Sequence, residues 1–141
     1  MEPYTYIEHT ADLQFIAYGK NLEEALRNSI GAVANIIADT ETIKGSLKKS
    51  ITIKGQDLKA VIYNLIEEMI YLLDAEQFVV KKASSLRVNH VGKEYWLTAV
   101  LEGDTISDDH ELKTPIKAAT YNDMFIKEEK EKVTIQCVVD I

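Results

Sequence analysis

The stretch GQDLKAVIYNLIEEMIYLLD, residues 55–74, decides most of the fold. Its apolar side chains recur at three- and four-residue steps, which predicts an amphipathic helix. Asp57 stands just before this stripe and is a favoured N-cap residue, because its carboxylate can accept a hydrogen bond from a free backbone N–H. Gly55 closes a preceding stretch from Leu47 to Ile53 that favours a strand. We therefore expect a strand that ends at Gly55 and a long helix that begins after Asp57.

A second helix is expected upstream on the same kind of evidence. Asn21 with Glu24 three residues later resembles a capping box, and apolar residues then recur from Leu22 to Ile37. This helix should end near residues 38–39. Most other segments alternate with period two, and we predict strands at residues 4–8, 13–18, 47–55, 78–83, 86–90, 95–102, 116–126 and 133–139, with turns at 91–93, 103–104 and 127–132.

The order of these elements predicts an α+β fold. Two helices are too few, and lie too early in the chain, for a doubly wound parallel sheet. We expect two layers, with both helices packed on one face of a mixed, mostly antiparallel sheet. The chain has 141 residues, which fits one domain spanning 1–141.

The charge balance bears on possible partners. The chain carries 23 acidic and 16 basic residues, a formal net charge of -7, and this field repels a phosphate backbone. Its lysines occur as scattered pairs such as Lys48-Lys49 and Lys81-Lys82, without an RNP-type aromatic motif. We expect no direct nucleic-acid binding. A net acidic surface suits solubility or docking to a basic protein, and an enzyme that handles RNA would offer one.

The location of the protein is predicted from segments that the sequence lacks. The N-terminal residues do not have the pattern of a signal peptide, and no run of about 18 apolar residues occurs. Cys137 is the single cysteine, so no disulfide within the chain can form. We expect a cytoplasmic protein with no membrane association.

Polar residues at predicted strand ends are the candidates for a site: His9, Asp12, Asp39, Asp140 and the terminal carboxylate of Ile141. Carboxylates from Asp12 and from this terminus would repel one another if they met, and a hard divalent cation would offset that repulsion. The pattern therefore allows a calcium or magnesium site. The alternative is that Asp12 caps a turn and Asp140 is a solvated strand end. The pattern alone leaves both readings open.

Other candidates for chemistry have simpler structural interpretations. Residues 104–111 contain three aspartates, a glutamate and His110, which could bind a metal or transfer protons, but a solvated surface loop is favoured. Cys137 alternates in phase with Val133, Ile135 and Val139, which favours core packing over nucleophilic catalysis. The three histidines do not form a zinc motif. We expect no enzymatic activity.

Several segments together resemble the archease family. They are EHTAD at 8–12 leading to AYG at 17–19, Ala38-Asp39, GQDL at 55–58, LLD at 72–74, KAATY at 117–121 and the final VDI at 139–141. The resemblance implies a non-enzymatic accessory protein that activates an RtcB-type RNA ligase in tRNA splicing and RNA repair. Such a protein promotes guanylylation and multiple turnover of the ligase.

The resemblance also implies particular residues. It assigns a divalent cation, usually calcium, to Asp12, Asp140 and Ile141, and a functional role to Lys117. The chain departs from the family pattern at Asn122, where histidine is usual, and at Ala119, where valine is more usual. The change at Asn122 removes an imidazole to which the resemblance would otherwise assign a role.

Three rival functions belong to other classes. An RNA-binding domain would bind RNA with an affinity that falls steeply as salt rises, and the acidic balance of the chain argues against it. A general protein-binding module or chaperone would lack the ligase partner, and only a partner measurement separates it from the first reading. A metal-dependent hydrolase would need a general base beside an open metal position, and the sequence offers no evident base.

Overall fold

The computed structural model describes residues 2–8 and 11–141. The two long helices begin and end near the predicted residues, and the α+β class is confirmed. The elements are β1 (Tyr4–Glu8), β2 (Asp12–Gly19), α1 (Leu22–Ile37), η1 (Thr40–Thr42), β3 (Leu47–Gly55), α2 (Leu58–Glu76), β4 (Phe78–Val91), β5 (Glu94–Thr105), β6 (Ala118–Ala119), β7 (Phe125–Glu129) and β8 (Lys132–Asp140).

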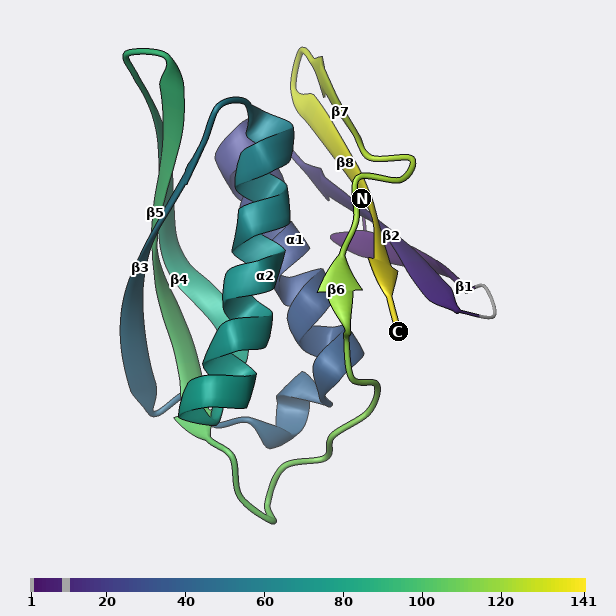
Figure 1. Ribbon diagram of the computed structural model, residues 1–141, viewed down its shortest axis with the longest axis vertical. Helices are drawn as coiled ribbons and strands as arrows, with labels where there is room; N and C mark the ends of the chain where they lie inside the picture. Colours follow the sequence, from purple (N-terminus) through teal and green to yellow (C-terminus); the bar gives the residue numbers. More distant parts are fainter. Residues whose placement is uncertain (1, 9–10) are drawn as a thin grey trace.

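The strands form two antiparallel sheets rather than the expected single sheet. One sheet has the order β1-β2-β8-β6, with β7 also paired to β8, and the other has the order β3-β5-β4. Figure 1 shows α1 and α2 lying between the two sheets. The expectation of two layers with the helices on one face is therefore corrected to three layers.

The composition of α1 explains the third layer. Nine of its 16 residues are buried, which is more than the single stripe that one sheet would cover. Small residues beside the predicted stripe, Ala25, Ser29 and Ala32, are buried as well. A helix that is apolar around most of its circumference must be covered on two sides, and the second sheet provides that cover.

Four predicted strand or turn boundaries differ from the structure. The segments 78–83 and 86–90 belong to one strand, β4, whose register shifts between Val80 and Lys82 and between Ala83 and Ser85. The predicted turn at 103–104 lies inside β5. The segment 116–126 pairs only near its two ends, as β6 and the start of β7. The predicted turn at 127–132 begins inside β7, which continues to Glu129. Bulges explain the first difference, because an extra residue breaks period-two alternation without ending the strand.

The same local structure connects each helix to the strand before it, and we call this structure the strand–helix corner. A strand ends in glycine, one residue follows, an Asn or Asp caps the helix, and an Asn seven positions after the cap bonds back to the strand. The first corner comprises Gly19, Asn21 and Asn28, and the second comprises Gly55, Asp57 and Asn64. The caps accept hydrogen bonds from Glu24 and Ala60 N–H, both at 2.8 Å. The Asn Nδ2 groups donate to the carbonyls of Tyr18 and Lys54, at 2.6 and 2.9 Å.

Both corner glycines are required by close backbone contact. A Cβ built on Gly19 would lie 2.3 Å from the Ala25 nitrogen, and one on Gly55 would lie 2.7 Å from the Val61 nitrogen. The first turn of each helix thus packs directly against the end of the preceding strand.

The inner face of the five-stranded sheet contains Cys137. Its side chain is fully buried, and burial raises the pKa of its thiol to about 12, so the prediction of a core residue is confirmed. No helix of the described residues is long and apolar enough to cross a membrane.

Candidate functional site

The pairing of β2 with β8 brings Asp12 and Asp140 face to face. The two residues are direct partners in the ladder, and the N–H of Ile141 donates to the Ala11 carbonyl at 3.2 Å. This bond makes the neighbouring Asp12–Asp140 pair a non-hydrogen-bonded one, in which facing side chains lie closest. The last two residues therefore lie against Ala11 and Asp12 at the start of β2, although the cation itself stays a prediction.

The electrostatics of this pair favour a positive partner. Like charges directly opposite on antiparallel strands destabilise the pairing. In addition, Oδ1 of Asp12 is buried and accepts no hydrogen bond from residues 2–8 and 11–141. A buried carboxylate oxygen without a partner is costly, and a calcium or magnesium ion would provide the missing interaction. Asp12 and Asp140 therefore fit the divalent cation that the resemblance implies.

An open polar recess of about 450 Å³ adjoins Asp12. It is lined by Asp12, Gln14, Asn122, Asp123 and Val138. Gln14 lies two residues after Asp12 and so on the same face of β2, a relation that period-two spacing in the sequence already indicates. The Asp123 carbonyl accepts a hydrogen bond from Gln136 Nε2 at 2.8 Å, which ties this turn to β8. Residues with amide and carboxylate side chains thus line the recess beside Asp12.

Lys117 lies beside the last residues. Its N–H donates to the Asp140 carbonyl at 2.8 Å, and its exposed side chain takes part in no ion pair among residues 2–8 and 11–141. The backbone of Lys117 therefore lies at the same rim as Asp140, and its side chain is exposed to solvent.

The remaining predicted site residues are not brought to this rim by any described contact. Asp39 caps η1, because its Oδ1 accepts from Glu41 N–H at 3.0 Å, and its own N–H donates to the Glu111 carbonyl at 2.8 Å. His9 lies outside the described residues. Among the described residues, no group of three or more His, Cys, Asp or Glu side chains is placed to hold a metal. A cation at Asp12 and Asp140 would therefore need further oxygen ligands from the backbone, from amides or from a partner.

The acidic loop at 104–111 is only partly the solvated loop that was favoured. Asp108, Asp109 and Glu111 are exposed, but the side chains of His110 and Asp104 are 4% and 13% exposed. His110 Nε2 lies 2.9 Å from Asp104 Oδ2, and His110 Nδ1 accepts from Ser107 N–H at 3.0 Å. This pattern requires a proton on Nε2, so the imidazole donates to the carboxylate. The pair closes the loop onto the end of β5.

Asp104 also holds the segment before β3. Its carboxylate accepts hydrogen bonds from the backbone N–H groups of Lys44, Gly45 and Ser46 at 2.8 to 3.0 Å. Partial burial raises the pKa of Asp104, but the bonds from His110 and these N–H groups outweigh it and lower the pKa to about 2. The Asp104 carboxylate therefore has a structural role, which we call the clamp, because both of its oxygens already accept hydrogen bonds from this chain.

We expect Asp104→Asn to lower the free energy of unfolding by about 2 kcal/mol at pH 7. The folded pKa of Asp104 lies below its ordinary value of 3.8, so the stabilisation is present above pH 4 and is lost as pH falls towards 2. Urea unfolding at several pH values measures the difference between the two proteins. Asp109→Asn, an exposed change in the same loop, is the control and should shift stability by less than about 0.5 kcal/mol. A deficit in Asp104→Asn that did not narrow in acid would contradict the clamp.

Comparisons with known proteins give a consistent result. Residues 4–141 match the model of the Archease protein family. The chain is 32% identical over 139 residues to protein archease of Methanosarcina mazei, covering 98% of this chain and 95% of the relative. It is 36% identical over 135 residues to protein archease of Aeropyrum pernix, covering 95% and 94%.

Solved structures share the fold. The solution structure of protein 1598 of Methanobacterium thermoautotrophicum covers 100% of both chains, with a TM-score of 0.84 and 23% identity. The crystal structure of an archease from Thermotoga maritima, described as a possible chaperone, covers 96% of this chain and 94% of its own, with a TM-score of 0.59 and 19% identity.

Proposed function

The chain belongs to the archease family, and from that premise we propose that it is a non-enzymatic accessory protein that activates an RtcB-type RNA ligase. It promotes guanylylation and multiple turnover of the ligase in tRNA splicing and RNA repair. The surface that acts is the rim formed by Asp12, Asp140, Ile141 and Lys117. A divalent cation, calcium or magnesium, is held there.

One observation carries the proposal: Asp12 and Asp140 are direct partners across β2 and β8, and Oδ1 of Asp12 is buried without a hydrogen-bond partner among the described residues. Stability alone does not explain such a pair, because it costs free energy in the absence of a cation. Sites that oppose stability are characteristic of function. The exposed ammonium of Lys117 beside the same rim adds a group that can meet an acidic or phosphate group of a partner.

The residues of the chain position charge and perform no bond chemistry themselves. The ladder between β2 and β8 holds the Asp12 and Asp140 carboxylates in place before any partner arrives, which lowers the cost of ordering on binding. A bound cation supplies positive charge at this rim. Nucleophilic chemistry by Cys137 is disfavoured, because the thiol is fully buried and its pKa is raised. The described rim thus suits docking to an enzyme better than catalysis.

A general protein-binding role is the second candidate. The similar Thermotoga maritima archease is described as a possible chaperone. In this chain Tyr121 and Phe125, which follow Lys117, are 53% and 39% exposed, and Tyr121 stacks on Tyr63 with centroids 4.5 Å apart. Exposed aromatic side chains near the rim offer apolar contact area to a protein partner.

Ligation under multiple-turnover conditions tests the proposal. With an RtcB-type ligase at low concentration and RNA in excess, we expect the protein to raise the number of ligations per ligase well above one and to speed guanylylation. The matched control is the same amount of heat-unfolded protein, which should have no effect. If the protein instead suppressed aggregation of unrelated proteins and left the ligase unchanged, the chaperone role would replace the activator role.

A further inference from the structure

The outer face of the sheet β3-β5-β4 gathers basic side chains that are far apart in the sequence. Residues on this face alternate with buried ones along all three strands, and the register places them in rows across the sheet. The rows are Lys48–Glu102–Lys82, Ser50–Val100–Ser85, Thr52–Thr98–Arg87 and Lys54–Trp96–Asn89. We call these twelve residues the basic face.

The charge on this face is opposite to that of the whole chain. The twelve residues carry four basic side chains and one carboxylate, Glu102, which lies 3.9 Å from Lys82 Nζ. The same alternation along β5 places two more carboxylates, Glu94 and Asp104, beyond the two ends of these rows. The whole chain has a net charge of -7. We expected no nucleic-acid binding because these basic residues are scattered along the sequence. Local potential depends on which charges share a surface, and the sheet register collects them.

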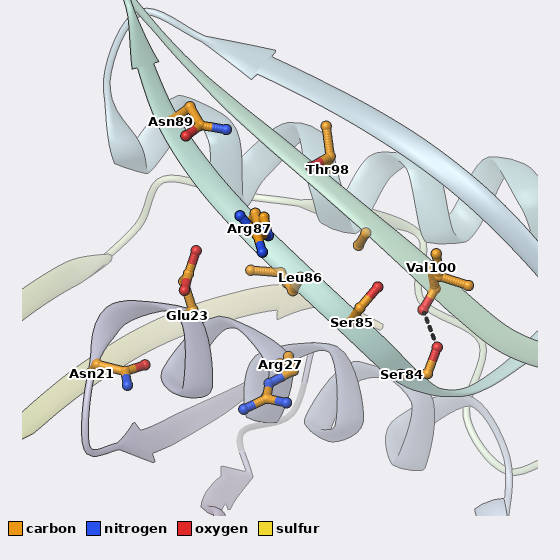
Figure 2. A pocket seen from close by; sticks show the side chains of 11 residues that line it. Asn21, Glu23, Arg27, Ser84, Ser85, Leu86, Arg87, Asn89, Thr98 and Val100 are labelled. Atoms are coloured by element: carbon orange, nitrogen blue, oxygen red, sulfur yellow. Dashed lines mark hydrogen bonds between the residues drawn. The ribbon is translucent and has the colours of Figure 1, made fainter.

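An open groove of about 670 Å³ borders the basic face at the edge strand β4. Figure 2 shows Arg27 and Glu23 on α1 and Arg87 on β4 among the side chains that line it. Arg27 and Arg87 are the only arginines of the chain. Both are exposed, and neither forms an ion pair among the described residues.

The rest of the groove supplies neutral hydrogen-bonding groups. Ser84, Ser85, Asn89 and Thr98 line it. Among the described residues that line the groove, Glu23 is the one carboxylate, and its Oε2 accepts a hydrogen bond from the Val88 N–H at 2.9 Å. Guanidinium, hydroxyl and amide groups together are the usual contacts to phosphate and sugar oxygens.

We propose that the basic face and its groove bind single-stranded RNA through the phosphate backbone. Lys48 and Lys54 lie six positions apart on β3, a span of roughly 20 Å that accommodates several successive phosphates. Trp96 lies on the same face, with Lys54 Nζ 4.2 Å from its ring centroid, so charge and an aromatic surface occur together.

A protein partner fits this face less well than a nucleic acid does. Protein interfaces depend on buried apolar or aromatic anchors. The large apolar side chains that are strongly exposed among the described residues are Ile7, Leu47, Tyr71, Val91, Leu112, Tyr121 and Phe125. None is one of the twelve residues of the basic face, and Val91 alone continues that face beyond the row of Asn89. The choice of RNA over DNA rests on the proposed function, whereas the phosphate contacts do not depend on it.

Fluorescence anisotropy with a labelled twelve-nucleotide RNA and the protein alone, without a ligase, tests the proposal. We expect binding that weakens as salt rises, with a slope of about -0.7 in log K against log salt for each phosphate contacted. Lys54→Gln combined with Arg87→Gln should weaken binding about tenfold at low salt and reduce the slope by about 1.4. The control is Lys127→Gln with Lys130→Gln, an equal charge change at exposed positions of the β7–β8 hairpin.

Each other molecule that could bind the basic face predicts a different experimental result. The proposal is overturned if the wild-type protein does not bind the RNA at low salt, or if the control pair weakens binding as much as the test pair. An acidic peptide of glutamates that binds as tightly as the RNA would make a protein segment the occupant. A dimer that the test pair dissociates would make a second copy the occupant. Equal affinity for DNA of the same sequence would overturn the choice of RNA. Because no ligase is present, failure here leaves the activator assay unaffected.

Discussion

Replacing Asp12 and Asp140 together by asparagine is expected to return the guanylylation rate of the partner ligase to that of the ligase alone. The side chains keep their size, but both charges that would hold a cation are removed. The same change should abolish stabilisation by calcium, which for a single site at a hundred times its dissociation constant is about 2.7 kcal/mol. Thermal unfolding with and without calcium, followed by the guanylylation assay, measures both effects.

The stability of the double variant without calcium provides a second, independent test of this prediction. The facing carboxylates repel each other in the wild-type protein, so the double variant should be as stable or more stable by roughly 0.2–1 kcal/mol when calcium is absent. Asp74→Asn, at an exposed position near the end of α2, is the control and should change neither the calcium effect nor activation. If the double variant still activated the ligase fully, the rim would have no role in activation.

Gly103→Ala is expected to cause the largest loss of stability, more than about 4 kcal/mol. Gly103 is buried in β5 opposite Val80, at the point where the register of β4 shifts. A Cβ there would lie 2.1 Å from the Val79 carbonyl oxygen and 2.8 Å from the Phe78 ring. The first contact is with backbone, which cannot move without breaking the β4–β5 ladder. Guanidinium unfolding measures the loss.

Gly92→Ala separates this packing effect from conformational strain. Gly92 lies in the turn between β4 and β5 with φ +62, and no atom lies within 4 Å of a Cβ built on it. Its substitution should therefore cost only the left-handed backbone energy, roughly 1–2 kcal/mol. Equal losses in the two variants would show that close packing at Gly103 is not the cause.

The local features of the fold could be predicted from the sequence because they depend on nearby residues. The caps at Asn21 and Asp57 and the stripes that follow them specify both helices within one or two turns. The division of the strands into two sheets could not be predicted in this way. It depends on pairings such as β2 with β8, which no local sequence pattern predicts. It also depends on the small residues of α1, which were not counted in its apolar stripe.

The residues of the candidate site also fall into those that could be predicted from local sequence and those that could not. Asp12, Asp140 and Ile141 could be chosen because each lies at a predicted strand end, and the resemblance joined them. Gln14 and Asp123 were missed, since their place in the recess follows from the ladder and from a turn with positive φ at Asp123. The basic face was missed for the same reason: its members become neighbours only across strands.

The repeated strand–helix corner also bears on how the chain folds. Its side-chain bonds, from Asn28 to Tyr18 and from Asn64 to Lys54, each close a loop of ten residues. The bond from Gln14 to Gln136, by contrast, joins β2 and β8 across 122 residues. Closing a short loop costs less entropy, so the two corners should form early and act as nuclei. The strands that carry Asp12 and Asp140 would then join last, and the rim would exist only once the whole chain has collapsed.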